Sequence, residues 1–413
     1  MSDPAQRGAN VAVLIRIMTD DNDTAAPDPT TDAVPVEYSS INRNSPFTTE
    51  QSTEATGSLV GGAADVQGQA ATFGFQSRIK GAGNGVVYTS SVKPPLHSAL
   101  AACGMKPLFT AAIVAALATA GGATAVTLPA SFPATARALM GMPLMIGAGV
   151  GVGRVPFVIE YTAGRVATLT ENFSTPLDAT TSLALPANWT YAGTSPSDAA
   201  SRLTDQPKAV IYLYRDGVLW KYTHCRGIVD LSGNAAKRGM AQFTFTGIFA
   251  GREDVAVPAN LVVANHLAPT LVKGSGAGAS SVALLKRREL SLSTWSLTNG
   301  SQVTSPEDPN TPQGFGPGEI GGRVPVLTVD PLATLVANRD TITDIGTGTV
   351  MPGVLRHGMT QGNRWAVTMP QLQLTGESDT QRGDLVGEQI TAQAQSIGKD
   401  ATGRDTDRII SFY

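Results

Sequence analysis

The chain is poor in charged residues, in aromatic residues and in cysteine. Asp, Glu, Lys and Arg together make up 15% of its 413 residues, and the net charge is −3. This composition disfavours a protein that grips nucleic acid with a basic face. Aromatic residues account for only 6%, which leaves little material for an exposed aromatic platform. A long chain with so few charges instead indicates a surface that becomes buried against copies of itself.

The two cysteines, Cys103 and Cys225, exclude a dense disulfide framework and favour a reducing compartment. We expect no secretory signal, because no basic stretch followed by a long apolar run opens the sequence. The uncharged segment 108–126 is nearly long enough to span a bilayer. It is rich in Ala, Thr and Gly and lacks aromatic or basic flanks. We therefore expect it to be buried or to face another subunit, and we expect no membrane partner.

Patterns that carry catalysis, metal binding or cofactor binding are missing too. The Gly-rich run 147–154 fails GxGxxG, and the match at 274–279 follows no strong strand, so the latter indicates a linker. Cys225 follows His224, but neighbours on a strand point to opposite faces. We therefore expect no enzyme activity, no catalytic or metal-binding residue and no cofactor. The histidines show neither HxxxH nor HExxH spacing; they are His97, His224, His266 and His357.

Glycine and proline, by contrast, are abundant, with 44 and 26 residues, which suits many short strands and turns. The clearest strand signal lies in residues 208–249. Asp216-Gly217 between two apolar runs predicts a hairpin, because a type I′ turn needs positive φ at both central residues. We expect a further strand at 225–229, and another where Ala241, Phe243 and Phe245 alternate with polar residues. The stretch is therefore predicted to be an antiparallel meander.

The first part of the chain divides into several predicted segments. The acidic, Pro-containing residues 1–32 are expected to form an extended, exposed arm. A β domain is predicted at 33–260, interrupted by an insertion at about 105–195. Within it we expect strands at 34–41 and 70–79, a long polar tract 42–67 between them, and a short helix that ends at Gly104.

The second part repeats this order after a Gly/Ser-rich linker at 261–284. A second β domain is predicted at 285–413. It begins with a strand near 288–297, a polar tract 298–322 and another strand. A short helix at 331–338 capped by Asp330 and a hairpin-rich end follow. Because strand, long tract, strand, short helix and meander occur twice, we predict an internal duplication.

Several segments resemble, in this order, the major tail tube protein of long-tailed (siphovirus-type) bacteriophages, in its larger form. The resemblance covers most of residues 34–413 and depends on the order of motifs more than on any single one. The matching segments are VKPPLHSALAACGM (92–105), YRDG (214–217), CRG (225–227), AQFTFTG (241–247), GREDVAVP (251–258) and GNRWAVTMPQLQL (362–374).

The resemblance implies an all-β fold with a few short helices. Tandem β-sandwich or partial-barrel domains would join those of neighbours into a ring-wide β-barrel. A duplicated chain needs three copies for a pseudo-hexameric ring; an unduplicated one needs six. The tracts 42–67 and 298–322 are expected to reach the adjacent ring through Asn42, Phe47, Glu50, Glu54, Asp65, Glu307, Asp308, Phe315 and Glu319. The candidates for sheet pairing within a ring are Tyr212, Tyr214, Phe243, Phe245, Trp365 and Val367.

The function implied by the resemblance is structural. Rings of the chain would stack into the tail tube of a virion, assembled in the host cytoplasm, through which DNA passes without specific binding. The expected partners are further copies of the chain, a tape measure protein, a tail terminator and distal tail proteins. The alternative function is a surface-binding β-protein, either an adhesin or a carbohydrate-binding module, which would expose an aromatic patch.

Overall fold

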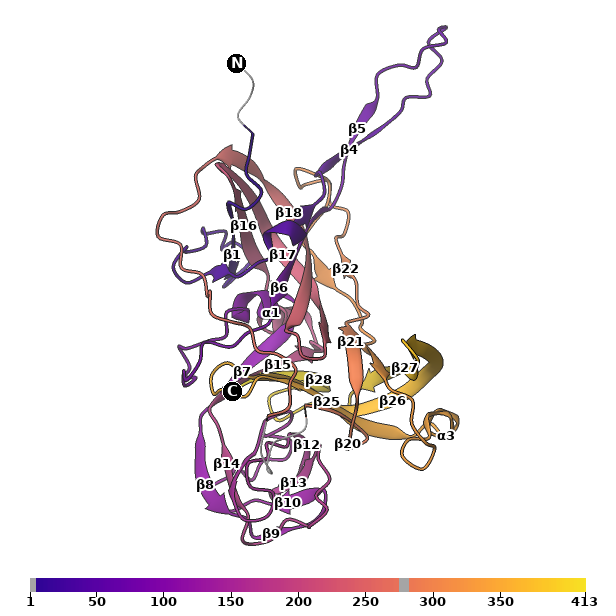
Figure 1. The fold of residues 1–413 in the computed structure, drawn as a ribbon. Coiled ribbons are helices and arrows are strands. Elements are labelled where there is room, and N and C mark those ends of the chain that lie inside the picture. Colours follow the sequence, from indigo (N-terminus) through magenta and orange to yellow (C-terminus); the bar gives the residue numbers. More distant parts are fainter. Residues whose placement is uncertain (1–4, 275–281) are drawn as a thin grey trace.

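The computed structural model describes residues 5–274 and 282–413, and strands dominate it (Figure 1). The prediction of an all-β protein with a few short helices is confirmed. Residues 275–281, which belong to the predicted linker, lie outside the described residues, as do residues 1–4 of the predicted arm. The helices of the described chain are η1 (Tyr38–Ser40), α1 (His97–Ala102), α2 (Ala199–Asp205) and α3 (Thr341–Gly346).

One large antiparallel sheet runs through the whole molecule. Its strands are β1 (Val11–Ile17), β2 (Ala33–Val34), β3 (Asn42–Arg43), β6 (Ala71–Arg78), β7 (Met105–Thr110), β15 (Asn188–Thr194), β16 (Ala209–Arg215), β17 (Val218–Asn234), β18 (Gly239–Asp254), β19 (Ala283–Leu285), β20 (Arg288–Glu289), β21 (Leu292–Thr298), β24 (Val326–Pro331), β25 (Val350–His357), β26 (Trp365–Arg382), β27 (Leu385–Gln395) and β28 (Arg404–Phe412).

Four smaller sheets surround it. Two lie between β7 and β15 in the chain and form the lower lobe of Figure 1. The other two are pairs of strands in the long polar tracts. The strands are β8 (Ile113–Leu117), β11 (Met145–Ala148) and β14 (Ser182–Leu185); β9 (Ala120–Gly121), β10 (Ala125–Thr127), β12 (Val158–Tyr161) and β13 (Val166–Leu169); β4 (Phe47–Glu50) and β5 (Asp65–Gly68); β22 (Val303–Thr304) and β23 (Glu319–Ile320).

Two halves of the large sheet share one strand order. Antiparallel neighbours run β2-β1-β16-β17-β18-β6-β3 in the first half. In the second half they run β20-β19-β25-β26-β27-β24-β21. A short helix, α1 or α3, precedes the meander of each half, and a strand pair, β4–β5 or β22–β23, lies in each tract. An internal duplication would leave this shared order in the structure.

The predicted meander forms from β16, β17 and β18. Asp216 and Gly217 have φ of 42° and 93°, so the two-residue turn has the expected type I′ geometry. The separate strand predicted at 225–229 is wrong, because it continues β17. A bulge joins the two parts: His224 has φ of 53°, and the register with β18 shifts between Thr223 and Arg226.

The predicted arm at 1–32 is wrong for β1, which is a core strand. Val11–Ile17 pairs with β16 along its whole length, and Val13 and Ile15 belong to the main hydrophobic core. These seven mostly apolar residues pair with β16 at the edge of the sheet. The free energy gained by burying them outweighs the polar character of the residues that follow. The strand predicted at 34–41 is also shorter, because η1 replaces its second half.

The helix predicted at 331–338 is absent. Pro331 ends β24, and the helix begins later, as α3, with the Asp340 side chain accepting a hydrogen bond from the backbone N–H of Thr343. The uncharged segment 108–126 forms strands β7 to β10, and Val114 and Leu117 on β8 are 83% and 58% exposed. Within residues 5–274 and 282–413, no helix is long and apolar enough to cross a membrane.

The main core is continuous between the two halves. It contains Phe73, Phe75, Phe243 and Phe245 from the first half and Trp365 with its neighbours from the second. The lower lobe has a separate core, built from residues 118–185. The predicted division into domains at 33–260 and 285–413 stays a prediction. The main hydrophobic core contains residues from both predicted domains.

Two histidines, the part-buried His97 and the fully buried His357, make the fold sensitive to acid. His97 starts α1, and its Nδ1 lies 2.7 Å from the hydroxyl of Tyr191. Burial, with a smaller effect of Lys93, lowers the pKa of His97 to about 4. Full burial against Trp365 lowers the pKa of His357 to about 3. Both rings must therefore stay neutral in the folded chain.

We expect the free energy of unfolding to fall with pH below about 6.5, by up to about 1.4 kcal/mol per pH unit for each histidine. Because the pKa of His97 is depressed in the folded chain, the stability that its neutral ring contributes is fully present above pH 6.5. That stability is lost as the pH falls toward 4. Urea unfolding at several pH values from 7.5 to 4.5 measures this slope. His97→Gln should reduce it, and an unchanged slope in that variant would contradict the assignment.

Candidate assembly surfaces

The first long tract forms a ribbon that leaves the body of the molecule (Figure 1). β4 and β5 pair from Phe47 opposite Gly68 to Glu50 opposite Asp65, and residues 51–64 form its tip. Leu59, Val60 and Val66 are 108%, 77% and 72% exposed, so they pack on nothing in their own chain. An element of this kind with exposed apolar side chains is typical of a contact to another molecule.

Five residues predicted to reach an adjacent ring lie on this ribbon or at its base. Asn42 is at the base in β3, and Phe47, Glu50, Glu54 and Asp65 follow along the ribbon. The whole segment from residue 44 to 77 contains no Lys or Arg. The ribbon is therefore acidic as well as apolar. The contact role of these five residues stays a prediction.

The second tract lies on its own subunit. Glu319 pairs with Arg226 at 2.7 Å and with Arg202 at 3.3 Å, and the Arg226 side chain is only 1% exposed. Burial lowers the pKa of Arg226, and the carboxylate of Glu319 opposes that effect. Removing Glu319 would leave a buried guanidinium without its ionic partner. Glu319 therefore fastens this tract to β17 instead of extending it outward.

The remaining candidates of the second tract are held in its own loop. Glu307 and Phe315 form an isolated bridge, and the backbone N–H groups of Asn310 and Thr311 donate to Asp308. Residues 298–322 thus fold back onto their own chain, and the expectation that they reach an adjacent ring stays a prediction. What distinguishes the two tracts is the ion pair between Glu319 and Arg226 of β17. This pairing can be recognised only once the strands are placed in the structure.

The two tracts meet at the base of the ribbon. Gln313 donates from Nε2 to the carbonyl oxygen of Phe249 at 3.2 Å, and its backbone lies against Gly68. A Cβ atom on Gly68 would lie 1.9 Å from the carbonyl oxygen of Gln313. The second tract therefore braces the ribbon through a contact that only glycine permits.

The six residues predicted to pair sheets within a ring do not lie on sheet edges. Each sits on a strand that has a partner on both sides within the chain, so its backbone groups have no room for a neighbour's strand. Four of them are also fully buried in the main core. The residues are Tyr212 and Tyr214 on β16, Phe243 and Phe245 on β18, and Trp365 and Val367 on β26.

Three arginines gather near the base of the ribbon without an ionic partner. The guanidinium of Arg43 lies 3.4 Å from the ring centre of Trp220, and that of Arg252 lies 5.4 Å from it. Desolvation and then the charges of Arg215 and Arg252 act to lower the pKa of Arg43. Within the part of the chain that the structure describes, none of the three forms an ion pair with a carboxylate. Their guanidinium groups remain available to an outside anion.

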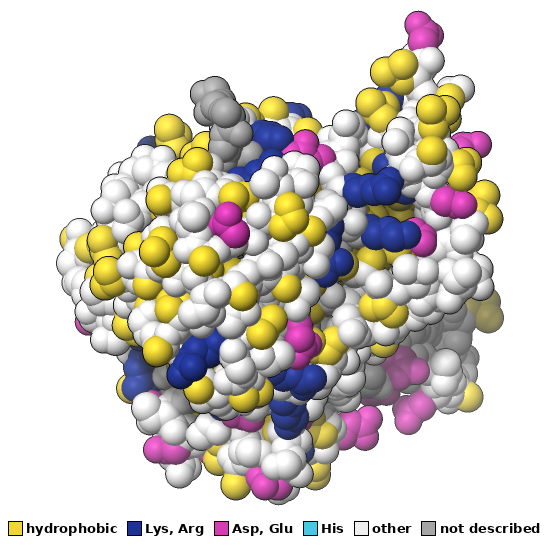
Figure 2. Space-filling model, turned by 90° about the horizontal axis from the view of Figure 1, so that it is seen from below, with side chains coloured by type: hydrophobic (Ala, Val, Ile, Leu, Met, Phe, Trp, Pro, Cys, Tyr) yellow, Lys and Arg dark blue, Asp and Glu magenta, His cyan; other side chains and the backbone are white. Residues whose placement is uncertain are grey.

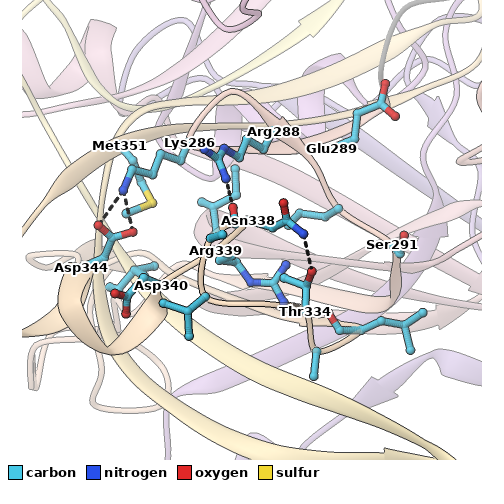
Figure 3. A pocket seen from close by; sticks show the side chains of 17 residues that line it. Lys286, Arg288, Glu289, Ser291, Thr334, Asn338, Arg339, Asp340, Asp344 and Met351 are labelled. Atoms are coloured by element: carbon cyan, nitrogen blue, oxygen red, sulfur yellow. Dashed lines mark hydrogen bonds and ion pairs between the residues drawn. The ribbon is translucent and has the colours of Figure 1, made fainter.

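A cavity of about 750 Å³ lies between the β19–β20 hairpin and the segment before α3 (Figure 3). Lys286 Nζ contacts both carboxylate oxygens of Asp344 at 2.6 and 2.8 Å, and Arg339 pairs with Glu388 at 2.6 Å. Arg288 donates to the carbonyl oxygen of Asn338. The polar groups around the cavity thus engage one another, and no activated nucleophile faces it.

The chemistry elsewhere is equally sparse. Burial raises the pKa of both thiols, Cys103 and Cys225, which keeps them protonated and unreactive. No cluster of three His, Cys, Asp or Glu side chains suited to a metal ion occurs in residues 5–274 and 282–413. Figure 2 shows a face covered mostly by uncharged and hydrophobic side chains, with charged ones in small separate groups.

Comparison with known proteins found no family model that matches the chain and no curated protein that is similar to it.

We expect Gly68→Ala to weaken the attachment of the ribbon. The added methyl group would meet the Gln313 backbone, so strand and tract must separate at a cost of about 1–3 kcal/mol. Limited proteolysis should cut the ribbon faster in this variant, and thermal unfolding should occur at lower temperature. Gly62→Ala is the matched control, because its nearest neighbour would be 3.7 Å away. Equal behaviour of the two variants would contradict the brace.

Proposed function

We propose that this chain is a structural subunit that assembles into stacked rings and forms a tube, the conduit for DNA in the tail of a long-tailed bacteriophage. The resemblance described above suggests this function. The observation that supports it best is the ribbon β4–β5, whose apolar side chains have no partner in their own chain. Such a ribbon needs a second molecule to bury Leu59 and Val60.

The shared strand order of the two halves supports a ring of three chains. One chain supplies two copies of a seven-strand arrangement, so three chains present six of them around an axis. Closed rings of identical subunits are a common outcome when one surface of a chain fits another. Ribbons that extend from one ring would then contact the next ring.

The charge of the chain is compatible with a DNA conduit. A basic lining would hold the duplex through its phosphates and slow its passage, and a net charge of −3 is compatible with a weakly charged or acidic lining. The surface-binding alternative has less support. Of the exposed large hydrophobic side chains in the described residues, only Tyr38 and Phe47 are aromatic, and they form no platform.

Replacing the ribbon tip, residues 51–64, by a two-residue Asn-Gly turn should abolish tube formation and leave a folded subunit. The reason is that Leu59 and Val60, each worth about 1.5–3 kcal/mol when fully buried, would lose their contacts in the next ring. Electron microscopy and sedimentation velocity measure assembly, and circular dichroism checks the fold.

Leu59→Ser with Val60→Ser tests the same contact without changing chain length. The control carries Val114→Ser with Leu117→Ser, which alters two comparably exposed residues on β8. Tubes of normal length from the truncated chain would refute the role of the ribbon. Wild-type protein that stays monomeric at all concentrations would refute the proposed function itself.

A further inference from the structure

The two halves of the large sheet are joined by one short antiparallel ladder. The last residues of β17 pair with β21 through Leu231 opposite Leu297, Ser232 opposite Ser296, Gly233 opposite Trp295 and Asn234 opposite Thr294. A Cβ on Gly233 would lie 2.7 Å from the indole nitrogen of Trp295, so the strands approach closely. In the first half this joint uses the edge of β17 beyond its pairing with β16. In the second half it uses β21, the strand before the long tract.

The same two edges exist again in the chain, and both are free. β26 takes the place of β17 in the second half, and its outer part, residues 375–382, pairs only with β27. β3 takes the place of β21 in the first half, and it pairs only with β6. No other described strand pairs with either edge. A chain with two such unpaired strand edges completes its sheet only when neighbouring chains supply the missing strands.

An aromatic contact supports the equivalence of these strands. In the second half, Trp295 on β21 lies 6.3 Å from Trp365 at the start of β26. In the first half, Arg43 on β3 stacks on Trp220 near the start of β17. We take Arg43 as the counterpart of Trp295. Because Gly233 and Gln381 each precede the last residue of their strand, we take them as counterparts too.

Apart from Arg382, which pairs with Asp330 of its own chain, the charges of the two free edges are complementary. Arg43 and its neighbours Arg215 and Arg252 lack a carboxylate partner. On the outer part of β26, Glu377 and Asp379 form no ion pair with a cation of the described chain. Bringing the two edges together would place the unpaired carboxylates near the unpaired guanidinium groups. This charge complementarity favours a second copy of the chain over another anion as the partner of the arginines.

We propose that the outer part of β26 pairs with β3 of a second copy of this chain, antiparallel, with Gln381 opposite Arg43. The contact repeats between chains the joint that β17 and β21 make within one chain. Because one copy gives β26 and receives on β3, the interface is heterologous and closes into a ring when the rotation allows. The proposal rests on the proposed assembly and specifies its contact within a ring.

Paired cysteines at Arg43 and Gln381 test this register. Directly opposite residues in an antiparallel pair have Cβ atoms about 4.5–5.5 Å apart, close to the distance that a disulfide spans. Under mild oxidation, assembled Arg43→Cys/Gln381→Cys protein should form covalent oligomers up to the closed ring on a non-reducing gel. The native thiols are buried and should not interfere.

Mixing adds a directional control. Chains with only Arg43→Cys and chains with only Gln381→Cys should form covalent dimers when mixed, and neither should do so alone. Arg43→Cys with Thr380→Cys is the register control, because a shift of one residue turns the side chain to the other face. Assembled wild-type protein together with no cross-link from any pair would overturn the joint and leave the tube proposal standing.

Charge reversal gives an independent readout. Glu377→Lys with Asp379→Lys should shift the protein from rings to single chains in sedimentation velocity, and adding Arg43→Glu with Arg252→Glu should restore rings. Asp384→Lys is the matched control, because it changes charge in the turn beyond the joint. Rings unaffected by the first reversal would overturn the pairing. Absence of assembly in the wild type would overturn both the joint and the proposed function.

Discussion

The backbone hydrogen bonding of the long strand β17 is the constraint on which the rest of the structure depends. Along its 17 residues β17 finds partners in β16, β18 and finally β21. Backbone N–H and C=O groups removed from water must be paired, so the outer end of β17 draws the second half of the chain against the first. The bulge at His224 bends the strand so that both tasks are met. The counterpart strand β26 makes the same demand, and its outer end is paired on one edge only, with β27.

The two long tracts show how one pair of charges changes the use of similar sequence. Both are polar, have similar length and are followed by a strand that pairs with the last strand of a meander. The second is held down because Glu319 neutralises Arg226, which is buried in β17. In the first, none of Glu50, Glu54 and Asp65 forms an ion pair within the described residues, so the tract extends as a ribbon that is braced at Gly68. Assembly surfaces thus arise where partners within the chain are lacking.

Prediction from the sequence succeeded where the signal was local. The Asp216-Gly217 turn, the alternation at Phe243 and Phe245, and the all-β class with few helices follow from short-range rules. It failed for the helix at 331–338, where Asp330 resembles a cap but its carboxylate instead accepts from the backbone of Ser293 and Thr294 in β21. It also failed for Val11–Ile17, since an apolar strand beside a polar tract is placed by a partner strand 200 residues away.

The sequence by itself determined the strands of the meander, the tight turn at Asp216-Gly217 and the all-β class, because these depend on neighbouring residues. Only the tertiary structure decided which strands are central and which are edges. Tyr212, Phe243 and Trp365 are residue types that strands favour, and the sequence placed them at edges that pair with a neighbouring chain. In the structure, both sides of their strands are already paired with other strands of the same chain. Edges are defined by long-range pairing, which no local pattern encodes. The free edges of β3 and β26 and the unpaired arginines around Trp220 therefore became visible only in the folded chain.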